Sequence, residues 1–398
     1  MEKILYGFHA EAFEKELEEL LTWWSGHMPD PENGGFWGKI RGNNQVEKYA
    51  DKGIILNARI LWFFSAACNL GYSQYRPWAD KAFEYLMAHF ADKEFGGVYW
   101  MVDCHGGLLN GKKQSYAQAF ALYAATEYYQ LCGMESSLAL AMQLFYKLED
   151  EAKDPFQGGY IEALDQQWQA MKNVALSEKE EDDVKTMNTH LHILEAYTNL
   201  ARAFHNEKVM SALDELIRLY IKWFIDGETG RLKLFFDLDW NERVSHTSYG
   251  HEIETAWLLN EACKVCGNPE LTAQAKDLGL KIAKRVLTGG RDEKAAIYNE
   301  KYSDGHFHHQ RDWWPQAEGV VGFFDAYQQN YNEAFLLAAE DLWTYIQLYF
   351  KDFQNGEWYW AVNEDGTPDT SQDKAGPWKA PYHNGRMCIE MIRRLSNV

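Results

Sequence analysis

The hydrophobic positions of this chain divide it into two alternating kinds of helical segment. Segments of the first kind are rich in Ala, Leu and aromatic residues and carry few charges; they span residues 56–70, 115–131, 189–204, 252–265 and 315–329. A helix that is apolar nearly all round is expected to be buried. Segments of the second kind, residues 10–24, 76–90 and 333–350, are amphipathic. The pattern predicts an inner and an outer set of helices.

A glycine followed by aromatic or strand-forming residues recurs along the chain. The occurrences are N-G-G-F-W-G (33–38), F-G-G-V-Y-W (95–100), Q-G-G-Y-I-E (157–162), T-G-R-L-K-L-F-F (229–236), T-G-G-R (288–291) and N-G-E-W-Y-W (355–360). Counted from one glycine of each, at 35, 97, 159, 230, 290 and 356, the steps are 62, 62, 71, 60 and 66 residues. Each step has room for one inner and one outer helix, so the chain consists of six repeats.

Six helix pairs predict an all-α fold, a single (α/α)6 barrel domain over residues 1–398 with six inner and six outer helices. The segments after the glycines are expected to form short hairpins or loops at one end. An open solenoid is the alternative, but solenoids end in polar capping repeats, whereas the last unit here is apolar. A closed ring is therefore favoured. The acidic run at 177–183 is expected to be a solvated loop.

Composition and charge narrow the possible partners. Hydrophobic residues make up 46% of the 398 residues, enough for a large core, and 16 Trp and 23 Tyr exceed what packing needs and can stack on a ringed ligand. The net charge of −20 repels phosphate backbones and anionic lipids, so neither nucleic acid nor membrane partners are expected. We find neither a signal region nor a membrane-spanning run and expect a cytoplasmic protein, a monomer or weak dimer.

Cysteine chemistry and metal sites find little support. The six cysteines lie mostly in apolar helical runs and are expected to be reduced; the C-x-x-C at 263–266 has no second pair and is interpreted as helix packing. The loop G-H-F-H-H (305–309) could bind a metal adventitiously, but no H-E-x-x-H occurs. Neither G-x-S-x-G nor a phosphate-binding glycine loop is present. We expect no metal and no cofactor.

Two histidine-bearing helices offer acid/base chemistry. Asn188 and His192 are four residues apart and share one helix face, whereas His190 lies about 200° from Asn188 and is expected to pack elsewhere. His251 and Glu254 share a face at the start of the next buried helix. An imidazole beside a carboxylate suits proton transfer. A hydrogen-bonded core histidine with a capping glutamate is the alternative.

A third histidine, His383, lies between Pro381 and Gly385 in a loop that enters the final helix, close to Trp378. Together the histidine stretches S-Y-G-H-E-I-E-T-A-W-L-L, M-N-T-H-L-H-I-L-E-A-Y and G-P-W-K-A-P-Y-H-N-G-R, with N-A-R-I-L-W-F-F and D-W-W-P-Q-A-E, resemble the cellobiose 2-epimerase branch of the N-acylglucosamine 2-epimerase family. The resemblance extends over nearly the whole chain. It implies an (α/α)6 barrel that epimerises or isomerises sugars at C2 without metal or nicotinamide.

The resemblance also implies roles for individual residues. His251 and His383 resemble the acid/base pair that faces opposite sides of C2, and His192 resembles a third histidine near the reacting oxygens. Arg59 resembles the arginine that holds the enediolate oxygens, with an ordinary helix salt bridge as the alternative. The residues implied to line the sugar pocket are Tyr116, Asn188, Glu254 and Glu318, with Trp314 and Trp378 around the sugar rings.

This chemistry suits imidazoles. Opening the sugar ring exposes an aldehyde that acidifies the C2 proton; a base on one face removes it, and an acid on the other face returns a proton to the cis-enediolate. Histidine titrates near ~6.5 and can take either role. A β-1,4-linked disaccharide is the expected substrate; mannose 2-epimerisation and aldose–ketose isomerisation are near alternatives. An inverting glycosidase using Glu254 and Asp312, or a non-catalytic binding barrel, are more distant ones.

Overall fold

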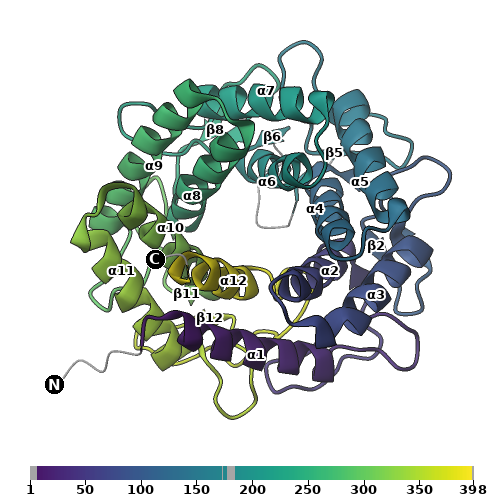
Figure 1. Ribbon diagram of the computed structural model, residues 1–398, viewed down its shortest axis with the longest axis horizontal. Helices are drawn as coiled ribbons and strands as arrows, with labels where there is room; N and C mark the ends of the chain where they lie inside the picture. The colour runs from purple at the N-terminus through teal and green to yellow at the C-terminus, as the bar shows by residue number, and fades with distance from the viewer. Residues whose placement is uncertain (1–6, 173, 177–183, 397–398) are drawn as a thin grey trace.

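The computed structural model describes residues 7–172, 174–176 and 184–396, which form two concentric rings of helices (Figure 1). The inner ring consists of α2 (Ile54–Asn69), α4 (Ser115–Cys132), α6 (Met187–Ala203), α8 (Tyr249–Cys266), α10 (Trp313–Asn330) and α12 (His383–Leu395). Every residue of α2 from Ile54 to Cys68 is buried, as its largely apolar sequence predicts. The (α/α)6 barrel and its five apolar helices are confirmed, and α12 supplies the sixth.

The outer ring consists of α1 (Ala10–His27), α3 (Arg76–Tyr85), α5 (Glu135–Lys147), α7 (Glu207–Trp223), α9 (Pro269–Gly289) and α11 (Glu333–Tyr345). A 3₁₀ turn, η1 (Ser73–Tyr75), precedes α3, and α3, α5 and α11 each continue into one π-helical turn: η2 (Leu86–Phe90), η3 (Leu148–Ala152) and η4 (Ile346–Phe350). In α7, the residues that face inward recur every three or four positions. These helices therefore bury one face and leave the other to water.

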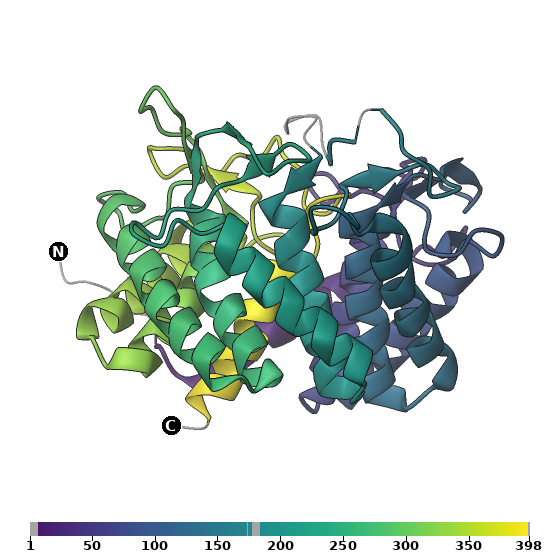
Figure 2. The same cartoon turned by 90° about the horizontal axis from the view of Figure 1, so that it is seen from above.

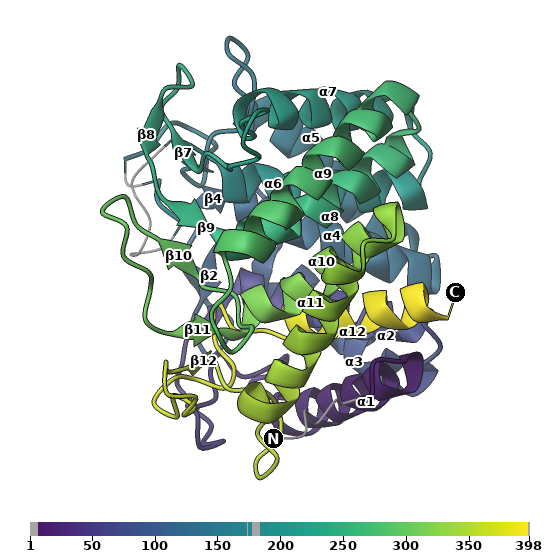
Figure 3. The same cartoon turned by 90° about the vertical axis from the view of Figure 1, so that its left-hand side faces the viewer.

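Short antiparallel strands gather at one end of the barrel (Figures 2 and 3). Each strand that leads into an inner helix pairs with a strand of the next repeat. The paired sets are β1 (Lys52–Gly53), β2 (Met101–Val102) and β3 (Leu108–Asn110); β4 (Lys113–Gln114) and β5 (Ala163–Leu164); β6 (Lys185–Thr186), β7 (Phe235–Phe236) and β8 (Glu242–Val244); β9 (Thr247–Ser248) and β10 (Glu300–Lys301); β11 (Arg311–Asp312) and β12 (Ala361–Val362). The expected hairpins at one end are confirmed, and they tie neighbouring repeats together.

An aspartate opens one turn in every repeat. Each such side chain accepts the backbone N–H two residues later, and the six are Asp30, Asp92, Asp154, Asp226, Asp292 and Asp352. In four repeats a buried lysine closes the turn at 2.6–2.9 Å from the carboxylate, in the pairs Lys52–Asp30, Lys113–Asp92, Lys185–Asp154 and Lys374–Asp352. In these four repeats the turn that carries the glycine signal is thus held by a buried ion pair.

The fifth glycine signal was assigned to the wrong segment. The motif T-G-G-R ends helix α9 at Gly289, and the turn of this repeat begins at Asp292. Ala295, three residues after Asp292, has a φ of +77° in that turn, whereas each of the other repeats has a positive-φ glycine four residues after its aspartate. Measured between the aspartates, the steps are 62, 62, 72, 66 and 60 residues. The repeat is real, but its fifth copy lacks the glycine that marks the others.

The first and last repeats join and close the ring. Trp358 Nε1 donates a hydrogen bond to Glu16 Oε1 at 2.7 Å, and Lys351 lies 2.7 Å from Glu16 Oε2. Ile40 bridges to Ala375 at the strand end. An open solenoid is therefore excluded. The six cysteines are free, as expected. The predicted acidic loop at 177–183 lies outside the described residues.

None of the described helices combines the length and the apolar character that crossing a membrane needs.

Candidate active site

Except for Trp378, which lies in the loop before α12, the predicted site residues lie in the first two turns of the inner helices, at the strand end of the barrel. Tyr116, Asn188 and Trp314 are each the second residue of α4, α6 and α10. His251 is the third residue of α8, and His383 is the first of α12. Arg59, His192, Glu254 and Glu318 are each the sixth residue of their helices. The N-termini of inner helices therefore converge on the site and supply partial positive charge there.

Carboxylates hold two of the histidines through Nδ1. His192 Nδ1 lies 3.0 Å from Glu195 Oε2, and His383 Nδ1 lies 2.7 Å from Glu318 Oε1. A carboxylate accepts the Nδ1 proton and so leaves the lone pair of a neutral imidazole on Nε2. No described residue bonds either Nε2 atom. Both rings are consequently oriented for proton transfer at Nε2.

The third histidine has a neutral partner. His251 Nδ1 lies 2.7 Å from Ser248 Oγ, at the end of the strand that leads into α8. The centre of the Trp314 ring lies 4.7 Å from that of His251 and 5.5 Å from that of His383. One indole therefore contacts both of the histidines that the resemblance assigns to acid/base catalysis.

Burial keeps these imidazoles neutral. It lowers the pKa of His251 to about 3, with a smaller contribution from the neighbouring His192. It also lowers the pKa of His383 well below its usual range, helped by the positive charges of Arg59 and Arg386. A neutral imidazole can accept a proton, so both groups are ready to act as bases at neutral pH.

Arg59 points a buried positive charge into the same region. Its Nη2 donates to the Tyr116 hydroxyl at 2.8 Å and its Nη1 to the Trp378 carbonyl at 3.1 Å. The guanidinium carbon lies 4.4 Å from the centre of the Phe120 ring and 4.8 Å from that of Tyr382. Among the described residues, no carboxylate pairs with it. The alternative of an ordinary helix salt bridge is therefore wrong.

Aromatic rings surround these groups. Trp314 and Trp378 are only partly buried, unlike most tryptophans of the core. The Trp378 ring centre lies 6.0 Å from that of Trp100 and 6.3 Å from that of Tyr116. Partly exposed indoles beside polar groups are the arrangement with which proteins bind sugar rings.

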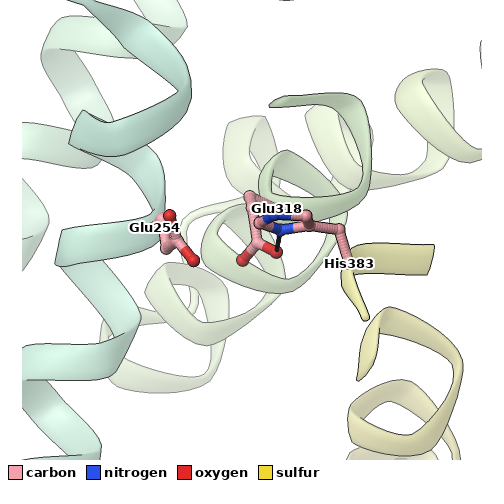
Figure 4. A group of neighbouring side chains, drawn as sticks. All are labelled: Glu254, Glu318 and His383. Carbon is pink, nitrogen blue, oxygen red and sulfur yellow. Dashed lines mark hydrogen bonds and ion pairs between the residues drawn. The ribbon is translucent and has the colours of Figure 1, made fainter. Parts of the chain in front are cut away.

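One helical turn further along, four charged residues form a buried layer, here called the charged layer: Glu195, Glu254, Glu318 and Arg386. Arg386 Nη2 lies 2.5 Å from Glu254 Oε1 and 2.7 Å from Glu318 Oε1, and Nη1 binds Glu195. Figure 4 shows Glu318 between Glu254 and His383. Oxygen and nitrogen ligands of these three residues lie close enough for a metal ion. The guanidinium already supplies the cation that the two carboxylates bind.

The charged layer changes the interpretation of its glutamates. Burial, together with the negative charge of Glu318, raises the pKa of Glu254 to about 8. Burial opposes ionisation of Glu195 as well, but Arg386 and His192 hold its pKa at about 2. The resemblance implied that Glu254 and Glu318 contact sugar. In the structure they bond instead to Arg386, His383 and Trp257, and both side chains are buried.

The structure confirms that His190 packs away from the site, but it shows no hydrogen bond between Asn188 and His192. His190 Nε2 accepts the Tyr160 N–H at 2.8 Å and Nδ1 lies 2.7 Å from the Thr186 carbonyl, so it packs away from the site as predicted. Asn188 makes no hydrogen bond to His192, and its buried Oδ1 has no partner among the described residues. Asp312 lies in β11, and its backbone N–H donates to Asn299 Oδ1 at 2.8 Å.

The chain was compared with known proteins. The family model for N-acylglucosamine 2-epimerase (GlcNAc 2-epimerase) matches residues 35–385. The chain belongs to this family. Cellobiose 2-epimerase of Bacteroides fragilis is 42% identical over 384 residues, covering 96% of this chain and 98% of that protein. Cellobiose 2-epimerase of Ruminococcus albus is 40% identical over 387 residues, covering 97% and 98%.

A solved structure agrees with this assignment. Cellobiose 2-epimerase from Bacillus thermoamylovorans B4167 matches with a TM-score of 0.92 at 37% identity, covering 97% of this chain and 99% of that chain. The resemblance seen in the sequence motifs is therefore confirmed, and this family member is a carbohydrate epimerase, a class of isomerase.

Sequence reasoning missed Arg386, Glu195 and Tyr382. Arg386 follows His383 by three residues and Glu195 follows His192 by three, the same spacing that drew attention to His251 and Glu254. Applied to all three histidines of this epimerase, that spacing would have indicated a second level of charged side chains. It would not have shown that they meet.

Proposed function

We propose that this protein is a cellobiose 2-epimerase, which interconverts reducing-end glucose and mannose in β-1,4-linked disaccharides such as cellobiose and lactose. The observation that carries the proposal is the Trp314 indole in contact with both His251 and His383. Two imidazoles beside one sugar-sized aromatic face are the groups that C2 epimerisation needs. The relatives that are 40–42% identical over nearly their full length support the disaccharide.

We assign the roles of the two histidines as the family resemblance implies them: His383, held by Glu318, is the base, and His251, held by Ser248, is the acid. From glucose to mannose, the C2–H bond breaks, its proton passes to Nε2 of His383, and the electron pair forms the cis-enediolate. Negative charge on the enediolate raises the proton affinity of His251, which takes up a proton from solvent and delivers it to the other face of C2. The proton on His383 then returns to solvent.

Arg59 and His192 act on the sugar oxygens. Because Arg59 has no carboxylate partner in the described structure, its charge is available for the enediolate, where a preorganised donor contributes about 3 kcal/mol. His192 assists ring opening. Trp314 and Trp378 hold the sugar by stacking, which permits the rotation about C2–C3 that presents the second face.

Proton NMR of cellobiose, incubated with chelator-treated protein in D2O, tests the proposal. We expect a new reducing-end mannose signal with deuterium at C2, and its loss in His251→Asn and His383→Asn. Release of free glucose would instead identify a glycosidase. Conversion of mannose with cellobiose unchanged would retain the mechanism and replace the substrate by a monosaccharide.

A further inference from the structure

Arg386 binds the carboxylates that orient two of the three site histidines, although it belongs to no part of the mechanism above. We propose that Arg386 is a positioning residue of this epimerase: it keeps Glu195 and Glu318 charged, and thereby keeps the proton of His192 and His383 on Nδ1. The inference rests on the proposed function for its kinetic consequence, whereas its effect on the histidines can be measured without turnover.

The guanidinium is the point where four inner helices meet. From α12 it binds Glu195 on α6, Glu254 on α8 and Glu318 on α10. Its position is fixed by packing as well, because its central carbon lies 4.3 Å from the Tyr382 ring centre and 4.8 Å from the Trp257 ring centre. Arg presents a planar fork of donors that can bind carboxylates in several directions at once, and a lysine cannot reproduce that geometry.

The single positive charge of Arg386 compensates the negative charges of the three buried glutamates around it. Without Arg386, the buried carboxylates of Glu195, Glu254 and Glu318 would repel one another, and such carboxylates take up protons. A protonated glutamic acid can donate to Nδ1 rather than accept from it. The imidazole proton would then move to Nε2, and the ring would lose the lone pair that accepts the C2 proton. The charge of Arg386 thus acts on the reaction through Glu318 and Glu195.

Arg386 itself does not reach the sugar side of the site. It is 2% exposed and lies one turn beyond His383 on α12. With Glu195 it lines a polar cavity of about 490 Å³ formed with later turns of the inner helices, including Thr198, Asn199 and Glu390. The charged layer therefore lies between this cavity and the histidines. Arg386 contacts the histidines' partners and not the reacting atoms.

The test compares Arg386→Met, Arg386→Lys and a matched control, Arg394→Met. Arg394 also lies on α12, is 9% exposed and pairs with Asp325 at 2.8 Å, but it bonds no partner of a site histidine. The readouts are the tautomers of the ¹⁵N-labelled histidines by NMR, kcat and KM for C2 exchange, and the melting temperature.

We expect Arg386→Met to move the proton of His192 and His383 to Nε2 and to lower kcat by about 10–100-fold, the usual effect of losing a residue that orients a functional ligand. Arg386→Lys, which keeps the charge, should retain the Nδ1 tautomers. Arg394→Met should lower the melting temperature without changing either tautomer or kcat.

Unchanged tautomers in Arg386→Met would overturn the inference and leave a structural arginine. If that variant does not fold, Arg386→Gln takes its place: it removes the charge but keeps polar atoms at the site, so we expect the same move of the proton to Nε2, and retention of Nδ1–H at both histidines would overturn the inference equally. A tautomer change in a protein whose wild type shows no sugar turnover would support the positioning role and reject the proposed function.

Discussion

Substitution of Arg59 should affect catalysis without affecting substrate binding. Its guanidinium is held by Tyr116 and the Trp378 carbonyl and has no carboxylate partner in the described structure. We predict that Arg59→Met lowers kcat by about 10²-fold, since a preorganised donor to the enediolate contributes about 3 kcal/mol. KM should change little, because stacking on the tryptophans binds the sugar. Steady-state kinetics on cellobiose measure both constants, and a raised KM with unchanged kcat would contradict the assignment.

His190 allows the cost of burying a neutral imidazole to be measured away from the catalytic residues. Burial lowers its pKa to about 3. Below pH ~6.5 His190 binds a proton in the unfolded chain but stays neutral in the folded protein. The free energy of unfolding therefore decreases as the pH falls from ~6.5 towards 3. We predict that His190→Gln loses about 2 kcal/mol less than the wild type between pH 7 and pH 5. Urea unfolding at both pH values measures this difference, and equal losses would show that His190 is protonated in the folded protein.

One buried ion pair holds the turn in each of four repeats, which are about 60 residues long. Lys113 and Asp92 lie 2.6 Å apart, and both side chains are fully buried. Lys113→Met leaves an unpaired buried carboxylate, so we predict a loss of about 3–5 kcal/mol. Adding Asp92→Asn should recover part of it.

Lys147 provides the control for this prediction, since it pairs with Glu151 at 3.0 Å on the surface. Exposed pairs contribute less than about 1 kcal/mol, so Lys147→Met should be nearly neutral. Chemical denaturation measures all these variants. A similar loss for Lys113→Met and Lys147→Met would mean that burial does not determine the strength of the pair.

Because the ring is closed, the stability of the whole barrel depends on the contacts between its first and last repeats. Glu16 on α1 accepts hydrogen bonds from Trp358 at 2.7 Å and Gln347 at 3.0 Å, and pairs with Lys351 at 2.7 Å. We predict that Glu16→Leu costs about 3 kcal/mol, because it leaves buried donors unpaired. Tryptophan fluorescence and circular dichroism should still follow one unfolding transition. Separate transitions would show that the repeats unfold independently, and Glu18→Gln on the exposed face of α1 is the control.

Local periodicity made the helices and the catalytic candidates predictable. Burial follows hydrophobic spacing, so the five apolar segments appeared within a few residues of α2, α4, α6, α8 and α10. The turn at Asp292 escaped because Ala295 adopts the positive φ that glycine marks elsewhere. The histidines were found because their titration suits proton transfer, and helical spacing from Asn188 distinguished His192 from His190.

The sequence by itself therefore determined the repeat, the inner and outer helices and the three histidines, because each depends on residues within a few positions of one another. Only the tertiary structure decided the partners. Glu254 shares a helix face with His251, yet it binds Arg386, which is 132 residues away; His383 binds Glu318, which is 65 residues away. Those pairs exist because ring closure brings α6, α8, α10 and α12 to one axis, and burial there leaves each charge no solvent to bind instead.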